Sequence, residues 1–423
     1  MGFSGERFLN TLVFNCGSSS LSYKIFHTPT GQPPQVVVAG KAHRVGVTGT
    51  EPAFVEHHAA GGGIDTQTTP IPDHRTAAGL ILEHLRTVSV GIDVVGHRFV
   101  HGGSLFDAPA FIDQDTLGKL RSCLPLAPLH NPIALSVIHE CCKSLPQARQ
   151  YVTFDSAFHC TIPDYAYTYA LPLQVVQRFG FRKYGFHGLS YWYVSRQVPG
   201  ILNIPADRLP LKIVACHLGT GGSSVAAIKG GRSMDTSMGY SPLPGLVMGT
   251  RSGDIDPMLM LYLMNVYGLR GDDLMDLLNK RSGLLGISGF SSDLTDIIAR
   301  LGRDEGEDEE EQPQLAFNMY IQRVRKYVGG YVVGLGGIDA LVFTDDIGVH
   351  NWRVREKVCQ DMEWSGIRLD AQRNRQATPD AICRISAADS RVAVLSVPTD
   401  EELVICLQGH ELLVQEGSPD AVT

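Results

Sequence analysis

The 423-residue sequence has no apolar run close to the roughly 18 to 20 residues that a membrane-spanning helix needs. Its start, Met1 to Phe14, lacks the basic residues and long apolar centre of a secretory signal. Lysine and arginine number 36 against 44 aspartate and glutamate residues, a formal net charge of −8. Such a chain offers no broad basic surface to a polyanion. We therefore expect a cytoplasmic protein that binds neither membranes nor nucleic acid.

The nine cysteines include no Cys-x-x-Cys pair, and Cys141 and Cys142 are adjacent. An odd number of thiols scattered over a long chain indicates neither a disulfide framework nor a zinc site. We expect reduced, mostly buried thiols.

Glycine is the one residue in excess, at 45 of 423 residues, against about 7% in average proteins. The glycines gather in a few loops. Because 43% of the residues are apolar, the chain can bury ordinary cores, and its length suggests two or three domains of about 150 residues.

A short apolar run that ends in small polar residues and glycine occurs twice. The first unit spans Leu12 to Phe26 around the phrase NCGSSS, and the second spans Ile213 to Ile228 around HLGTGGSS. Both patterns predict strand, tight loop, strand. A recurrence about 200 residues apart favours a duplicated domain over a solenoid, although two unrelated hairpins would give the same pattern.

Helical patterns separate these units, as an α/β fold requires. Residues 76–88 carry an apolar stripe at spacings of three and four. Asn131 and Pro132 predict a helix with Asn131 as N-cap and the proline in the first turn. The acidic run Asp304 to Glu311 predicts a solvated loop.

The two glycine-rich loops are suited to holding phosphate oxygens. Asn15 to Ser20 and His217 to Ser224 offer successive backbone N–H groups and hydroxyls at strand ends. Neither is a Walker loop, because no Gly-Lys-Ser/Thr follows. An ordinary Ser-rich turn would explain either loop alone.

Two arginines, one histidine and one aspartate lie in similar settings. Arg98 and Arg251 stand near glycines, and a guanidinium suits forked contact with carboxylate or phosphate. The alternative for each is an ion pair with a nearby acid, such as Asp254 for Arg251. His187 is flanked by glycines, and Asp155 follows a predicted strand, where catalytic acids are common. Either could equally be structural.

Together these phrases resemble the acetate kinase family from about Leu12 to about Leu407. The matching phrases are NCGSSSL, GHRFVHGG, APLHNP, FDSAFH, YGFHGLSY, HLGTGG, DTSMGYSPLPGLVMGTRSGDIDP, SGLLGISG, GGIDALVFT and PTDEEL. That family belongs to the superfamily of sugar kinases, actin and heat-shock ATPases. The resemblance implies an α/β fold of two duplicated ribonuclease H-like (actin-like ATPase) domains around an interdomain cleft.

The resemblance also implies how the domains divide the work. Residues 1–155 and 397–423 would form the first domain, on the acetate and magnesium side. Residues 156–396 would form the second, on the side of the phosphoryl donor and of dimerisation. A homodimer is expected from the family alone.

The implied activity is acetate kinase: reversible, Mg²⁺-dependent phosphoryl transfer between ATP and acetate, giving acetyl phosphate and ADP by direct in-line attack. The resemblance assigns Asn15 and Glu401 to Mg²⁺ and Arg98 to the acetate carboxylate. An apolar pocket for the acetate methyl group would be formed by Val100, Leu129, Phe186 and Pro242.

The implied catalytic residues are Asp155, His187 and Arg251. Arg251 and His187 would stabilise charge on the phosphoryl group during transfer. Acetate is ionised above about pH 4 and needs no strong base. Asp155 is therefore expected to orient Mg²⁺, water or an arginine rather than to remove a proton.

The implied nucleotide- and phosphate-binding residues fall in four segments. They are Ser18, Ser20 and Ser22; His217, Leu218, Gly219, Thr220 and Gly221; Asp293, Leu294 and Thr295; and Asp346, Ile347 and Gly348.

The sequence departs from the family pattern on the donor side. Asp346 replaces a glycine that lies against the nucleoside, and Ser22, Thr220 and Thr295 replace a lysine, an asparagine and an arginine. A carboxylate at that place would crowd the pocket and repel phosphate, unless Asp345 and Asp346 point outward. No residue assigned to acetate or the phosphoryl group is altered.

These departures leave several hypotheses open. ATP is the first choice of donor, and pyrophosphate is the alternative. A non-catalytic nucleotide or phosphate sensor would need fewer of the assigned residues. A kinase for propionate or butyrate is the third possibility, decided by the volume beside Val100, Leu129 and Pro242.

Overall fold

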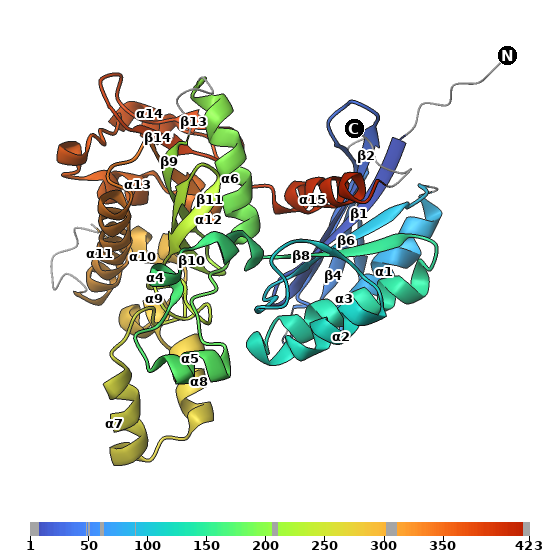
Figure 1. The fold of residues 1–423 in the computed structure, drawn as a ribbon, viewed down its shortest axis with the longest axis horizontal. Coiled ribbons are helices and arrows are strands. Elements are labelled where there is room, and N and C mark those ends of the chain that lie inside the picture. The colour runs from blue at the N-terminus through green and yellow to red at the C-terminus, as the bar shows by residue number, and fades with distance from the viewer. Residues whose placement is uncertain are drawn as a thin grey trace. The chain divides into compact units, whose positions relative to one another are not determined.

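The structure of the chain is a computed structural model that describes residues 8–417 except 48, 50, 60–62, 89, 205–209 and 302–310. The chain divides into two compact units (Figure 1). Unit 1 comprises Met1–Phe158 and Asp400–Thr423, and unit 2 comprises His159–Thr399.

Unit 1 is a mixed sheet with helices on its faces. Its strands are β1 (Phe8–Cys16), β2 (Ser20–Pro29), β3 (Gln35–His43), β4 (Phe54–Ala59), β5 (Ile64–Thr68), β6 (Val94–Phe99), β7 (Ala110–Phe111) and β8 (Arg149–Phe154). Its helices are α1 (His74–Thr87), α2 (Gln114–Ser122), α3 (Asn131–Ser144) and α15 (Glu401–Gln415), with a 3₁₀ turn at Leu124–Leu126 and another, Ala157–Thr161, at the border with unit 2.

Unit 2 has a second mixed sheet and more helices. Its strands are β9 (Lys212–Leu218), β10 (Ser223–Lys229), β11 (Arg232–Thr236), β12 (Ala340–Thr344), β13 (Cys383–Arg384) and β14 (Ala393–Ser396). Its helices are α4 (Asp164–Tyr167), α5 (Leu173–Phe179), α6 (Gly188–Ile201), α7 (Pro257–Tyr267), α8 (Gly271–Lys280), α9 (Gly283–Ser288), α10 (Leu294–Arg300), α11 (Glu311–Gly334), α12 (Asp345–His350), α13 (Trp352–Cys359) and α14 (Ala371–Gln376), with a 3₁₀ turn at Glu363–Ser365.

The two sheets share the topology of five central strands. In unit 1 the order is β5-β4-β3-β2-β1-β6-β8-β7, and in unit 2 it is β11-β10-β9-β12-β14-β13. In each, three antiparallel strands meet two parallel ones: β3-β2-β1 with β6 and β8, and β11-β10-β9 with β12 and β14. The duplication and the α/β class predicted from the sequence are therefore confirmed.

Alternation along β1 sends its side chains to two different helical layers. Leu12 and Phe14 join a core with residues of α1 and α3, while the hydroxyl of Thr11 lies 3.2 Å from Nε2 of His410 in α15. Because neighbouring strand residues point to opposite faces, α15 covers the face opposite to α1 and α3, as Figure 1 shows. The C-terminal helix is thus part of unit 1.

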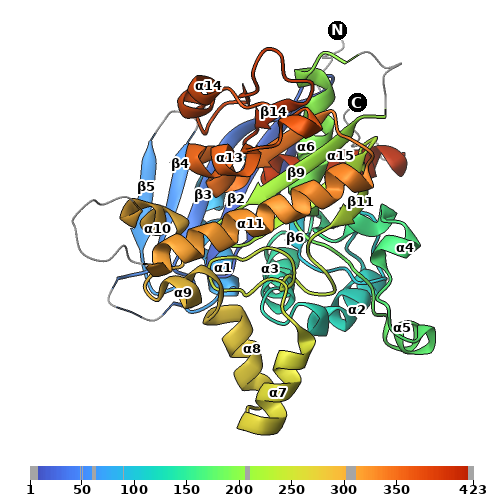
Figure 2. The ribbon, with the colours of Figure 1, turned by 90° about the vertical axis from the view of Figure 1, so that its left-hand side faces the viewer.

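The core of unit 2 lies between its sheet and the long helix α11. Val214, Cys216 and Leu218 of β9 pack in one cluster with Val324 and Val328 of α11. Figure 2 shows α11 running across this sheet. In both views α7 and α8 extend away from the sheet of unit 2.

The start of α3 differs from the sequence prediction. His130 is the N-cap, and Asn131 is the first helical residue. The Asn131 side chain is buried, where its amide donates to the carbonyls of His101 and Cys123. The asparagine therefore joins two other segments of unit 1 instead of capping the helix. The local pattern that predicted a cap could not show these longer-range partners. The predicted acidic loop lies outside the described residues except for Glu311, which begins α11.

None of the helices in the described ranges combines the length and apolar character needed to cross a bilayer.

Three buried histidines should make unit 1 sensitive to acid. Burial lowers the pKa of His57, His97 and His410 to about 4, so all three stay neutral in the fold while the unfolded chain binds their protons below about pH 6.5. Their contribution is complete above pH 6.5 and is lost as the pH falls toward 4, by up to about 1.4 kcal/mol per unit for each histidine.

We expect hydrogen exchange of the β6 amides to report this loss of stability between pH 6.5 and 5. Exchange is the suitable probe because Trp192, Trp352 and Trp364 all lie in unit 2. The variant His97→Gln should flatten the pH dependence by about a third, because His57 and His410 keep their contributions. An unchanged slope would contradict the assignment.

Candidate active site

Unit 1 holds a buried pair of opposite charges at the ends of two parallel strands. Arg98 lies in β6 and Asp155 directly follows β8. The two strands are parallel neighbours, with Arg98 opposite Thr153. Arg98 Nε and Nη2 donate to the two carboxylate oxygens of Asp155 at 2.8 and 2.5 Å. The side chain of Asp155 is 1% exposed and that of Arg98 16%. Asp155 therefore holds the guanidinium in a forked contact.

Charge decides the protonation state of this arginine. Burial lowers the pKa of Arg98, but the carboxylates of Asp155 and Glu401 raise it above the ordinary value. Nη1 of Arg98 also donates to Oδ1 of Asn15 at 3.0 Å. Arg98 is permanently charged and fixed from two sides, and its guanidinium still has N–H groups beyond these three bonds.

A carboxylate cluster begins α15 beside the end of β1. The amide of Asn15 donates to Glu401 at 3.3 Å and to Glu402 at 3.1 Å. Lys24 in β2 pairs with Asp400 at 2.9 Å and with Glu402 at 3.5 Å. Burial lowers the pKa of Lys24, yet the two acids together raise it above its usual value. Lys24 and Glu402 were not predicted; the signal for Lys24 was its position two residues after Ser22, on the same face of the strand.

This cluster fits a magnesium ion that is held mainly by its substrate. Asn15 and Glu401 offer hard oxygen ligands, and the Glu401 side chain is 15% exposed. No three His, Cys, Asp or Glu side chains in the described ranges form a closed metal site. Mg²⁺ commonly takes one or two carboxylates together with phosphate oxygens and water, so an open site with few protein ligands is the expected form.

In unit 2 the turn between β9 and β10 is tighter than the sequence predicted. Gly219 and Gly222 exchange backbone hydrogen bonds at 3.2 and 3.3 Å, and His217 and Leu218 belong to β9. Two of the four loop amides are thus used to close the hairpin. The amides of Thr220 and Gly221 are not used to close the hairpin.

His187 stands beside this turn in a left-handed backbone conformation. Its φ is +59°, and it precedes α6 as N-cap. Nδ1 of His187 lies 2.8 Å from Oγ of Ser224 in β10, which contacts the hydroxyl of Tyr191. The imidazole also stacks on that of His217 with ring centroids 4.0 Å apart. Such support fixes the ring.

Arg251 is close to the same turn. A β-carbon on Gly222 would lie 3.2 Å from Arg251 Nη1 and 3.5 Å from His187 Nε2, so these two side chains meet over the glycine. Nη1 contacts the Pro242 carbonyl at 3.5 Å. Burial lowers the pKa of Arg251, the direction expected for a guanidinium without a countercharge.

The alternative ion pair of Arg251 with Asp254 is not formed. Asp254 instead accepts from Tyr327 at 2.8 Å and from the amide of Gly245 at 2.8 Å, and Arg323 lies 3.5 Å away. Over the residues that the structure describes, no carboxylate pairs with Arg251. A partly buried cation without a carboxylate is costly unless an anion joins it.

Two carboxylates lie on the other side of the turn. Asp346 accepts from the Thr220 amide at 2.9 Å and from its hydroxyl at 2.6 Å. Oδ2 of Asp345 lies 3.0 Å from Nε2 of His217. Both aspartates therefore point toward the turn or the strand that precedes it. Asp345 was not assigned a role from the sequence.

The other predicted donor residues belong to both units. Ser18 lies in the turn after β1, and Ser20 and Ser22 belong to β2, all in unit 1. In unit 2, Asp293 caps α10 by accepting from the Thr295 amide at 2.7 Å. Leu294, Ile347 and Gly348 are buried.

One close approach connects the Asp293 segment to the glycine turn. A β-carbon at Gly249 would lie 3.0 Å from the Ser292 carbonyl and 3.5 Å from that of Thr220. Unit 2 therefore brings the Thr220 turn, Asp346 and the start of α10 into one neighbourhood.

The four residues of the predicted acyl pocket divide between the units. Val100 and Leu129 belong to unit 1, and Phe186 and Pro242 to unit 2. Leu129 is 57% exposed, whereas Phe186 is 1% exposed. The pocket itself stays a prediction.

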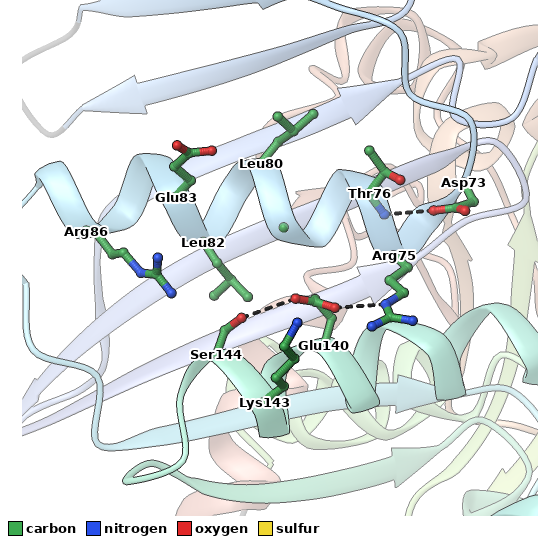
Figure 3. Close-up of a pocket in the computed structure, with 11 residues that line it drawn as sticks. Asp73, Arg75, Thr76, Leu80, Leu82, Glu83, Arg86, Glu140, Lys143 and Ser144 are labelled. Atoms are coloured by element: carbon green, nitrogen blue, oxygen red, sulfur yellow. Dashed lines mark hydrogen bonds and ion pairs between the residues drawn. The ribbon is translucent and has the colours of Figure 1, made fainter.

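Two hollows elsewhere contain none of the predicted site residues. One, of about 700 Å³, lies between α1 and α3 in unit 1 (Figure 3). Its charges are of both signs, and Arg75 pairs with Glu140 at 2.8 Å. The other, of about 550 Å³, lies along α11 in unit 2 between Tyr327 and Leu335. In both hollows basic side chains stand beside acidic ones, such as Glu140 in the first and Asp235 in the second.

Comparison with known proteins gives full-length matches. The acetokinase family model matches residues 10–407. The acetate kinase of Caldicellulosiruptor saccharolyticus is 43% identical over 412 residues, which are 96% of this chain and 100% of the relative.

Solved structures agree. The acetate kinase of Entamoeba histolytica is 44% identical, with a TM-score of 0.85 over 95% of this chain and 99% of that one. The acetate kinase of Porphyromonas gingivalis is 39% identical, with a TM-score of 0.84 over 96% of this chain and 100% of that one. A propionate kinase from Francisella tularensis is 33% identical, with a TM-score of 0.84 over 95% of this chain and 98% of that one.

With the duplicated fold, the paired Arg98, the uncompensated Arg251 and a match along nearly the whole chain, this protein belongs to the acetokinase family.

Proposed function

We propose that the chain is an acetate kinase, which transfers a phosphoryl group reversibly between ATP and acetate. The observation that carries the proposal is the Arg251 guanidinium, which meets His187 over Gly222 without a carboxylate partner in the described chain. Phosphoryl transfer needs fixed cations at the moving group and little covalent chemistry. The full-length relatives named acetate kinase supply the substrate class.

The acceptor would be held by unit 1. The forked bond from Asp155 leaves N–H groups of Arg98 for the acetate carboxylate. Acetate is already an anion at neutral pH, so no base is required and Asp155 acts by positioning Arg98. In this role Asp155 controls orientation rather than proton transfer.

The transferred group would be held by unit 2. Negative charge spreads over its equatorial oxygens during transfer, and Arg251 and His187 provide charge and N–H donors beside the Gly222 turn. Ser224 holds the His187 ring, so that Nε2 can donate in the protonated or the corresponding neutral form.

Asn15 and Glu401 are the residues we propose for Mg²⁺, and a bound Mg²⁺ would neutralise charge on donor phosphates. Lys24 would keep the α15 segment in place through Asp400 and Glu402. Residues 1–155 with 397–423 would thus serve acetate and metal, and residues 156–396 the donor. A cytoplasmic location is part of the same proposal.

The arginine roles predict large losses of rate. Arg98→Ala and Arg251→Ala should each lower kcat/KM for acetate at least about 100-fold, on the order of 3 kcal/mol of barrier. Arg251→Ala should leave stability nearly unchanged, because no carboxylate loses its partner, whereas Arg98→Ala leaves the buried Asp155 unpaired.

Arg368→Ala is the matched control, since Arg368 is exposed and pairs with Asp389 on the surface. It should retain full activity. Near-normal turnover in the Arg251 variant would refute the role of that residue.

Pyrophosphate is the second candidate donor. The carboxylates of Asp345 and Asp346 stand at the turn where donor phosphates are expected. Asp346 and Thr220, two of the departures from the family pattern, bond to each other, which favours a changed donor site.

The donor is decided by initial rates of acetyl phosphate formation with ATP and with pyrophosphate, each with acetate and Mg²⁺. We expect the larger kcat/KM with ATP. A preference for pyrophosphate would replace ATP as the donor, and no product from either would contradict the kinase activity. Propionate and butyrate in the same assay would measure the acyl pocket.

A homodimer is also proposed, with α7 in its interface. Every residue of α7 is at least partly exposed, including Leu259 at 51%, Tyr262 at 54% and Tyr267 at 66%. Exposed apolar surface of this extent usually marks an interaction site, and a second copy offers the same surface.

Leu259→Glu and Tyr262→Glu should convert a dimer into monomers in analytical ultracentrifugation, because a buried unpaired carboxylate is costly. Ile64→Glu, at a residue of unit 1 that is 65% exposed, should have no effect. A wild-type monomer, or a dimer that survives both α7 changes, would contradict this interface.

A further inference from the structure

The turn between β9 and β10 already binds carboxylates of its own chain. Oδ1 of Asp346 accepts a hydrogen bond from the Thr220 amide, and Oδ2 accepts one from the Thr220 hydroxyl. Since Gly219 and Gly222 use their amides to close the hairpin, Asp346 occupies one of the two amides left. These are the contacts that a phosphate oxygen would need.

Asp345 fills the space next to this turn. A β-carbon at Gly219 would overlap Oδ2 of Asp345, so the carboxylate fits only because residue 219 is glycine. The same oxygen lies 3.0 Å from Nε2 of His217, whose ring stacks on His187. A negative charge therefore sits beside the histidines that border the proposed phosphoryl site.

The backbone of Asp345 is held in an uncommon conformation. Its φ is +65°, in the left-handed region that costs a non-glycine residue energy. Contacts to His217 and the bonds of Asp346 to Thr220 hold the pair in place. Strain at this point indicates that the segment can be released more easily than a relaxed one.

We propose that Asp345 and Asp346 are internal competitors of the phosphoryl donor: their carboxylates occupy the Thr220 turn and must leave it before donor phosphates bind. This inference rests on the proposed function and deepens it by naming the residues that set donor affinity. Both aspartates then lower the affinity of the site for every polyphosphate. Their negative charge repels the ligand, and Asp346 occupies hydrogen-bond donors of Thr220 that the ligand would use.

A structural role for the two aspartates would give the opposite result. If the carboxylates only stiffened the turn, their removal would loosen the site and weaken donor binding. If they compete, their removal strengthens it. The sign of the change therefore separates the two roles.

The test is isothermal titration of sodium pyrophosphate, in excess magnesium chloride, into the full chain without acetate. Asp345→Gly/Asp346→Gly should lower the Kd for pyrophosphate at least tenfold, and glycine accepts the φ of residue 345 without strain. ADP in the same titration should show a gain of similar size, because both ligands present phosphates to the turn.

The matched control is Asp361→Gly. Asp361 is an exposed aspartate of unit 2 with a φ of +59°, so the change removes the same charge from a similar backbone conformation, away from the turn. It should leave the Kd within twofold of wild type. An equal gain in this control would reduce the effect to net charge and overturn the proposal.

Asp346→Asn keeps the test decisive if the double variant fails to fold. The amide has nearly the same shape and can still accept from the Thr220 amide, but it carries no charge. It should lower the Kd for pyrophosphate at least threefold. An unchanged or higher Kd in the folded variants contradicts the proposal.

Failure of this inference can be told from failure of the proposed function. Acetyl phosphate formed by the wild type with an unaltered Kd in the variants would reject internal competition alone. Absence of acetyl phosphate with every donor would reject the kinase, while the binding comparison would still decide the role of the two aspartates.

Discussion

The balance of charge around two arginines is the constraint on which the rest of the site depends. Arg98 is neutralised by Asp155 in unit 1, whereas Arg251 in unit 2 has no carboxylate partner among the described residues. A paired arginine is stable without a ligand and can orient a small carboxylate. An unpaired one is stabilised by an arriving anion. The two positions are thus prepared for different tasks.

The supporting residues follow from this division. Asp155 and Asn15 hold Arg98, and Ser224 holds His187. Each support is a buried or half-buried polar group whose own bonds are satisfied within one unit. Side chains fixed in this way lose little freedom when a substrate binds, which is the main source of rate in a reaction governed by alignment.

Local patterns predicted much of this arrangement, and long-range pairing explains what they missed. The two hairpins, their glycine turns and the duplicated topology were predictable because strand and turn signals are local. The bond between Asp346 and Thr220 joins residues 126 positions apart and depends on the parallel register of β9 and β12. Lys24 was missed for the same reason, since its partners lie in α15. The Asn131 cap was wrong because tertiary partners outcompeted a helix terminus.

The central claim is that the uncompensated guanidinium of Arg251 binds the phosphoryl group and stabilises its charge while it passes between donor and acetate. Its most direct measurement is the equilibrium binding of acetyl phosphate, in calorimetry without ADP, to wild type, Arg251→Ala and Arg368→Ala. The account predicts one site per chain in wild type and Arg368→Ala, and a Kd raised at least about 100-fold in Arg251→Ala. Equal affinity in all three proteins would contradict it.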